Sequence, residues 1–153
     1  MTPRIETIPH KKLVGQSLTM SFAHYRVASL WQSFLPCRKE IAKPLNRDLI
    51  SMAIYPPHHF KAFKPTNLFE RWAAVEVADF DDVPDQMQTF VLPGGLYAVF
   101  NYKGLHTDHS IFESIFTTWL PASGYVLDDR PHFEVLGEKY SNNDPESEEE
   151  IWI

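Results

Sequence analysis

The feature that most constrains the fold is an eight-residue pattern that occurs twice, once in each half of the chain. Residues Ser29–Pro36 have the sequence SLWQSFLP, and residues Ser114–Pro121 have the sequence SIFTTWLP, so the two segments match in kind at every position. In both, the apolar residues at the second and sixth positions lie four apart, which places them on one face of a helix. We therefore expect one amphipathic helix in each half, ended or kinked by its final proline.

Around the two helices the pattern changes to alternating β-branched and aromatic residues, which is typical of strands. The expected strands are Leu13–Met20, Leu49–Tyr55, Arg71–Ala78, Met87–Leu92, Leu96–Tyr102, Phe133–Tyr140 and Glu150–Ile153. Each half then has the order strand, helix, strand, strand. We expect an α+β fold made by internal duplication, with repeats at about 1–80 and 85–153, in which a curved antiparallel sheet carries both helices on one face around a central pocket.

Length and charge exclude several classes of protein. The 153 residues fit one domain, 1–153, and 14 Lys and Arg against 20 Asp and Glu leave a formal charge of −6. A basic surface for phosphate is missing, so we expect no direct nucleic-acid partner. Cys37 has no second cysteine for a disulfide, and no signal peptide or apolar run of membrane-spanning length is evident. We expect a cytoplasmic protein with no membrane partner.

Metal and cofactor motifs are absent from the sequence. The pairs His58–His59 and His106 with His109 have no carboxylate or cysteine at ligand spacing. Cys37 has no histidine beside it, and Gly94–Gly95 is followed by neither a lysine nor a helix pattern, as a phosphate-binding loop requires. We expect no metal and no cofactor, and we expect the acidic segment Asn142–Glu149 to be a solvated loop.

One carboxylate stands out because of its setting. Strand alternation puts His132, Glu134 and Leu136 on one face, and Phe133 and Val135 on the other. If the face of Glu134 points into the cleft between helices and sheet, its carboxylate is surrounded by apolar groups. Such a carboxylate marks a candidate ligand-binding site.

Several segments together resemble the GyrI-like effector-binding domains, which also form the ligand-binding part of AraC-type and multidrug-responsive transcription regulators. The resemblance covers essentially the whole chain. The segments that carry it are Pro3–Glu6, Leu13–Gly15, Leu30–Trp31, Arg71–Val77, Pro93–Phe100, Tyr102–Gly104, Trp119–Tyr125, Phe133–Glu134 and Glu150–Ile153.

The resemblance implies a duplicated α+β domain whose central pocket holds bulky lipophilic cations with a buried glutamate and stacked aromatic rings. Glu134 matches that glutamate, whereas Leu136 stands where the family commonly has an aromatic residue. For the aromatic wall we favour Trp72, Tyr97 and Trp119, with Tyr55 and Phe22 as weaker candidates.

Three functions follow from this resemblance. We favour a stand-alone binding module for lipophilic, cationic small molecules, without a helix-turn-helix of its own. The first alternative is a hydrolase of strained electrophilic toxins, in which Glu134 acts as general base on a water. The second is an interaction protein that inhibits DNA gyrase, or contacts a regulator, through exposed acidic residues such as Glu148–Glu150.

Overall fold

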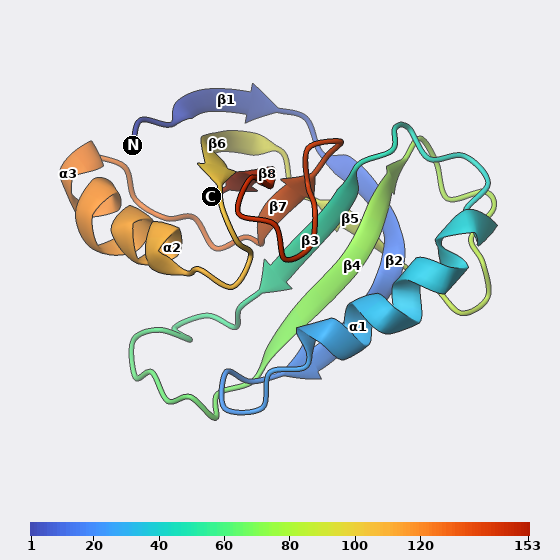
Figure 1. Cartoon of the computed structure of the whole chain (residues 1–153), viewed down its shortest axis with the longest axis horizontal. Helices are drawn as coiled ribbons and strands as arrows, with labels where there is room; N and C mark the ends of the chain where they lie inside the picture. Colours follow the sequence, from blue (N-terminus) through green and yellow to red (C-terminus); the bar gives the residue numbers. More distant parts are fainter.

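The computed structural model describes residues 1–153 and contains one eight-stranded antiparallel sheet with two helical segments (Figure 1). The strands are β1 (Arg4–Ile8), β2 (Lys11–Met20), β3 (Leu49–Ile54), β4 (Phe69–Val77), β5 (Gln88–Leu92), β6 (Gly95–Lys103), β7 (His132–Leu136) and β8 (Glu148–Trp152). The first helical segment is α1 (Val27–Phe34) with the 3₁₀ turn η1 (Leu35–Glu40). The second is α2 (Ser110–Ser114), the π-helical turn η2 (Ile115–Trp119) and α3 (Leu120–Ser123). None of the helices has the length and apolar character needed to cross a membrane.

The order of strands across the sheet is β1-β6-β8-β7-β3-β4-β2-β5. Exchanging β1 with β5, β2 with β6, β3 with β7 and β4 with β8 gives the same order read from the other edge. The expected α+β class and antiparallel sheet are therefore confirmed. That residues 1–80 and 85–153 superpose by a near-twofold rotation stays a prediction, which a rigid-body superposition of the two halves checks.

Strand register assigns one set of side chains to the face that carries the helices. Ala73 lies opposite Ser51, Ser51 opposite Glu134, Glu134 opposite Ile151, and Ile151 opposite Phe100. Residues directly opposite each other in a ladder project to the same side of a sheet, so all five share one face. We call this side the helix face.

Both helices pack on the helix face, as the repeated pattern predicts. Leu30 and Phe34 of α1 pack with Ala73 and other residues of β2 and β4. Ile115, at the start of η2, packs with Phe100 and Ile151. Figure 1 shows α1 beside β4 and β2, and α2 with α3 well apart from it. The strip of sheet between them includes β3 and β7, which meet where the two halves of the chain join.

The opposite side of the sheet, which we call the core face, holds the largest group of buried side chains. Its members are Leu13, Ile50, Met52, Trp72, Ala74, Leu92, Tyr97, Val99, Phe133 and Trp152. The rings of Phe133 and Trp152 are stacked at 5.2 Å, and Tyr97 contacts both rings edge-on. The curled sheet thus closes around an aromatic interior that leaves no polar group on this side of β7.

One strand was not expected, and several boundaries differ from the sequence expectation. The edge strand β1 was not expected, because its sequence RIETI is short and polar, yet it pairs with β6 from Arg4–Val99 to Ile8–Gly95. Strand β7 ends at Leu136 rather than Tyr140. Pro36 and Pro121 lie in the first turns of η1 and α3, where a missing N–H costs little, so the helical path continues past where we expected it to end or kink.

The close approach of β2 to β4 generates a stability prediction. A Cβ added to Gly15 would lie 2.7 Å from Ala74 Cα and 2.8 Å from Ala74 Cβ, so Gly15→Ala forces the two strands apart. We expect it to lower the free energy of unfolding by about 2 kcal/mol or more. The matched control is Gly124→Ala, where nothing lies within 4 Å and only the left-handed φ of 80° is strained, at about 1 kcal/mol. Urea denaturation checks both, and equal losses would contradict the prediction.

Candidate ligand-binding site

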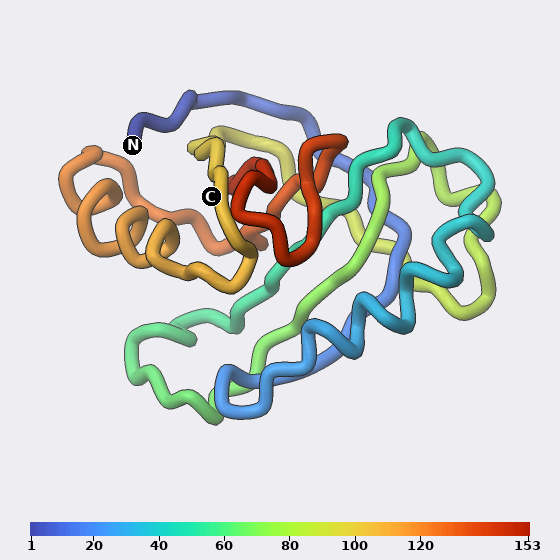
Figure 2. The backbone as a smooth tube through the Cα atoms, in the orientation of Figure 1, coloured from blue at the N-terminus to red at the C-terminus, as the bar shows by residue number.

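Glu134 projects from β7 into a small pocket on the helix face. The cavity has a volume of about 60 Å³ and is lined mainly by aromatic side chains. Its lining residues are Ala53, Tyr55, Phe60, Arg71, Phe112, Phe116, His132, Phe133, Glu134, Ile151 and Ile153. Tyr55 and Phe60 come from the loop after β3, and Phe112 and Phe116 come from the second helical segment, so two distant parts of the chain meet at one carboxylate. Figure 2 shows that loop as a long excursion between β3 and β4.

The aromatic rings of the pocket contact one another around His132. Phe116 is stacked on His132 with centroids 5.7 Å apart and planes at 21°, and Tyr55 meets His132 edge-on at 6.1 Å. Phe60 contacts Tyr55 at 4.8 Å. Burial, followed by the charge of Arg130, lowers the pKa of His132 to about 4. His132 is therefore neutral at physiological pH and acts as one more aromatic wall.

A second carboxylate lies beside Glu134. Glu149 is on β8, two residues from the Ile151 that faces Glu134, and its side chain is 9% exposed. Burial raises the pKa of Glu149 well above its usual range, and the charge of Glu134 and a hydrogen bond with it raise that pKa further, while Arg71 opposes the shift. A pKa raised this far keeps Glu149 protonated at neutral pH, as expected for a buried acid that lies beside a second one.

Arg71 is the cationic residue of the pocket, and it is bound to the sheet rather than to either glutamate. Its Nη2 donates to Ser51 Oγ at 2.6 Å, and its buried Nε has no partner. Burial raises the pKa of the nearby Tyr55 hydroxyl, although Arg71 lowers it in part. The pocket thus combines the Glu134 side chain, a guanidinium fixed by Ser51 and aromatic walls, and the protonated Glu149 lies next to it.

Comparisons with known proteins identify the family of the chain. The GyrI-like small molecule binding domain family matches residues 1–153. This chain belongs to the GyrI-like family. The chain is 28% identical over 155 aligned positions to the transcriptional regulator BrlR of Pseudomonas aeruginosa. The alignment covers the whole of this chain but only 55% of that regulator, so the chain spans about half of the regulator's length.

Solved structures show the same GyrI-like fold. The C-terminal domain of EcmrR has a TM-score of 0.71 and 16% identity, with 99% of this chain and 95% of that one covered. SAV2435, solved with tetraphenylphosphonium bound, has a TM-score of 0.68 and 17% identity, covering 99% and 92%. A hydrolase from Listeria innocua has a TM-score of 0.60 and 10% identity, covering 99% and 90%. At these identities the likeness is one of fold.

The GyrI-like fold brings together only part of the predicted site. Glu134 and Tyr55 line the pocket, and Leu136 lies on the helix face but outside the lining. Trp72 and Tyr97 lie on the core face, so the structure does not place them with Glu134. The physical reason is strand alternation. Arg71, next to Trp72, faces the helices, so the tryptophan ring is directed into the core.

Two further predicted residues lie near the pocket without lining it. Trp119 meets Phe100 edge-on at 5.1 Å and borders a separate cavity beyond His132. Phe22 contacts Phe69 at 4.7 Å, and Phe69 in turn contacts Tyr55, so Phe22 belongs to a neighbouring aromatic cluster. The aromatic wall that the structure supplies instead includes Phe60, Phe112 and Phe116. Phe112 and Phe116 were not singled out from the sequence, although their spacing of four places both on one helix face and could have indicated the pair.

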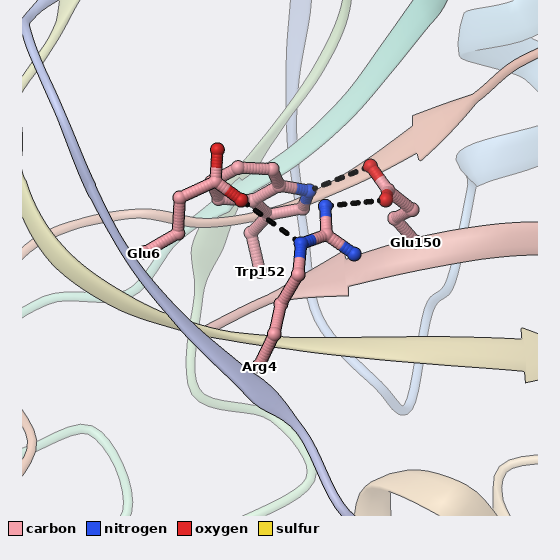
Figure 3. A network of polar contacts seen from close by, with 4 residues as sticks. All are labelled: Arg4, Glu6, Glu150 and Trp152. Atoms are coloured by element: carbon pink, nitrogen blue, oxygen red, sulfur yellow. Dashed lines mark hydrogen bonds and ion pairs between the residues drawn. The ribbon is translucent and has the colours of Figure 1, made fainter.

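The acidic run Glu148–Glu150 corrects another expectation. We expected Asn142–Glu149 to be a solvated loop and the run to be exposed, but Glu148–Glu150 lie in β8, where their environments alternate. Glu148 is exposed, Glu149 is buried, and Glu150 accepts a hydrogen bond from Arg4 at 2.6 Å and one from the Trp152 indole (Figure 3). The run therefore does not form the exposed acidic segment that we expected.

The protonated state of Glu149 generates a prediction about stability and pH. In the unfolded chain Glu149 ionises near its ordinary pKa, whereas in the folded domain its raised pKa keeps the proton bound. The free energy of unfolding therefore falls as the pH rises from the pKa of the unfolded state toward that of the folded state. Glu149→Gln keeps the size of the side chain and an N–H donor toward Glu134. Because glutamine does not titrate, the variant does not lose stability as the pH rises. We expect the variant to exceed the parent by about 1–3 kcal/mol at pH 8 and by much less at pH 5.

Urea denaturation at both values of pH measures the difference. Glu148→Gln, on the exposed neighbour, is the control and should change stability little at either pH. A Glu149→Gln variant that follows the parent at both values would contradict a proton held at Glu149.

Proposed function

We propose that the pocket at Glu134 binds lipophilic organic cations. The observation that carries the proposal is a carboxylate that faces aromatic rings on the helix face while the one arginine of the pocket is bound to Ser51. A cation about 4 Å from a carboxylate gains roughly 4 kcal/mol at an effective dielectric of about 20, and an aromatic face adds about 0.5–2 kcal/mol. The tetraphenylphosphonium bound to SAV2435 supports this class of ligand.

The size of the pocket requires movement on binding. Its 60 Å³ is far smaller than the roughly 300 Å³ at which drug-sized sites begin. Phe60 is 57% exposed and belongs to a loop, and Phe112 and Phe116 belong to short helical turns, so these rings can move without disturbing the sheet. We infer that a bulky cation displaces aromatic side chains and stacks on the rings that remain.

The second carboxylate makes the proposed binding depend on pH. A cation beside Glu134 also lowers the pKa of Glu149, because the bound charge favours the ionised form. Binding therefore releases protons in the pH range where Glu149 is protonated in the empty pocket. Affinity for a cation then falls as the solution becomes more acidic.

A charge-removal variant tests the role of Glu134. We expect Glu134→Gln to weaken binding of tetraphenylphosphonium by about tenfold or more, on the scale of 1.4 kcal/mol, because a partly desolvated ion pair is lost. The neutral probe triphenylphosphine oxide should change far less. Isothermal titration calorimetry measures both, with Glu138→Gln, on an exposed residue of the following turn, as the control. Equal weakening of the two probes, or unchanged phosphonium affinity, would remove Glu134 from the proposed role.

Hydrolysis is the second candidate, and the pair of carboxylates favours it. In this reaction Glu134 acts as general base on a water that attacks a strained electrophile, and Glu149 is its protonated neighbour. Glu134→Gln would then keep the compound bound but stop its consumption. Incubation with a strained electrophile such as an aryl epoxide, followed by chromatography, separates the two functions. Binding without loss of compound supports the binding module.

A further inference from the structure

A second and larger cavity adjoins the Glu134 pocket. Its volume is about 380 Å³, within the range of small-molecule sites. The end of the second helical segment, the segment Tyr125–Asp128 and the first residues of β6 form its walls, and His132 and Ile153 line both cavities. This cavity does not contain Glu134 or Glu149, so its chemistry is set by other residues.

Arg130 supplies the charge of this cavity. Its side chain is 13% exposed, its guanidinium lies 3.9 Å from the centroid of the Tyr97 ring, and it donates to the Leu96 carbonyl. A Cβ on Gly95 would come within 2.5 Å of its Nη1, so the glycine provides the space that the guanidinium occupies. The guanidinium is thus fixed in place by an aromatic ring and a backbone carbonyl, two partners without negative charge.

The counter-ion of Arg130 is weak. Asp128 is the acidic residue in ion-pair range, and it lies at 3.8 Å with 72% of its side chain exposed. A largely buried guanidinium gains most from a close carboxylate that is shielded from water and bound through two N–H groups. An anion entering the cavity could supply that contact, and exposed Asp128 loses little when it is displaced.

The remaining walls are apolar and aromatic. The rings of Trp119 and Tyr125 are nearly parallel, with an angle of 20° between their planes and 6.2 Å between their centroids. Leu120 and Leu127 also line the cavity. A ligand for this cavity therefore needs a flat or apolar body in addition to its charge. We propose that the cavity is a second ligand site, which takes a small amphipathic anion such as an aromatic carboxylate, with its carboxylate on Arg130 and its ring against Trp119 and Tyr125.

The probe for this site is 1-naphthoate, with neutral 1-naphthalenemethanol as its uncharged partner. Titration of the full chain, followed by calorimetry and by amide shifts in NMR spectra, should show naphthoate binding with shifts in residues 125–130. Arg130→Gln should weaken it about tenfold or more, because a charge-assisted pair is lost. Asp128→Asn should strengthen it about threefold, because the competing carboxylate is gone. The alcohol should respond to neither change.

A charge control and a second variant make the outcome decisive. Arg47→Gln, on an exposed arginine elsewhere, should leave naphthoate binding unchanged. If Arg130→Gln does not fold, as circular dichroism shows, Asp128→Asn still tests the charge with the arginine intact. Naphthoate that binds no better than the alcohol, or an Asp128→Asn variant that binds it no tighter, would overturn the proposal.

Discussion

The pairing of β3 with β7 at the middle of the sheet is the constraint on which the rest of the structure depends. It joins the two halves of the chain, and it places Ser51 opposite Glu134 and Met52 opposite Phe133. Adjacent residues of β7 thus serve opposite purposes, since Phe133 fills the aromatic core while Glu134 faces the helices. A slip of one residue would bury the carboxylate in that core and expose the phenyl ring. The stability of the core therefore fixes the position of the charge.

Burial of charge on the helix face is tolerated because protonation reduces it. Two ionised glutamates in one apolar pocket would repel each other and lose hydration, at a cost of several kcal/mol for each ion by general estimates. A proton held at Glu149 removes one of these charges, and the low pKa of His132 keeps its ring neutral. Arg71 partly opposes the protonation of Glu149. In the proposed function, Glu134 is the carboxylate that a bound cation contacts.

Local sequence patterns predicted the features that local physics decides. The repeated octapeptide located both helices, and alternation around Glu134 assigned it to the face opposite Phe133. The aromatic wall was harder to predict, because Phe60 and Phe112 reach the pocket from segments whose positions depend on tertiary packing. Alternation also showed that Trp72 and Arg71 face opposite ways, but only the register with β3 shows which of them faces the helices. No role was predicted for Glu149, because β8 begins with three glutamates and this part of the strand lacks the alternation of apolar and polar residues that marks a strand.

His132 links the two cavities physically. Its ring is stacked on Phe116 of the Glu134 pocket, and it also lines the cavity of Arg130, so one neutral ring borders both cavities. A protonated ring there would screen Glu134 and repel both a bound cation and Arg130, and burial prevents this by keeping the pKa near 4. If both sites are occupied as proposed, a cation and an anion lie in adjoining cavities of low dielectric. Their attraction then makes each ligand raise the affinity of the other, and this coupling must be reciprocal.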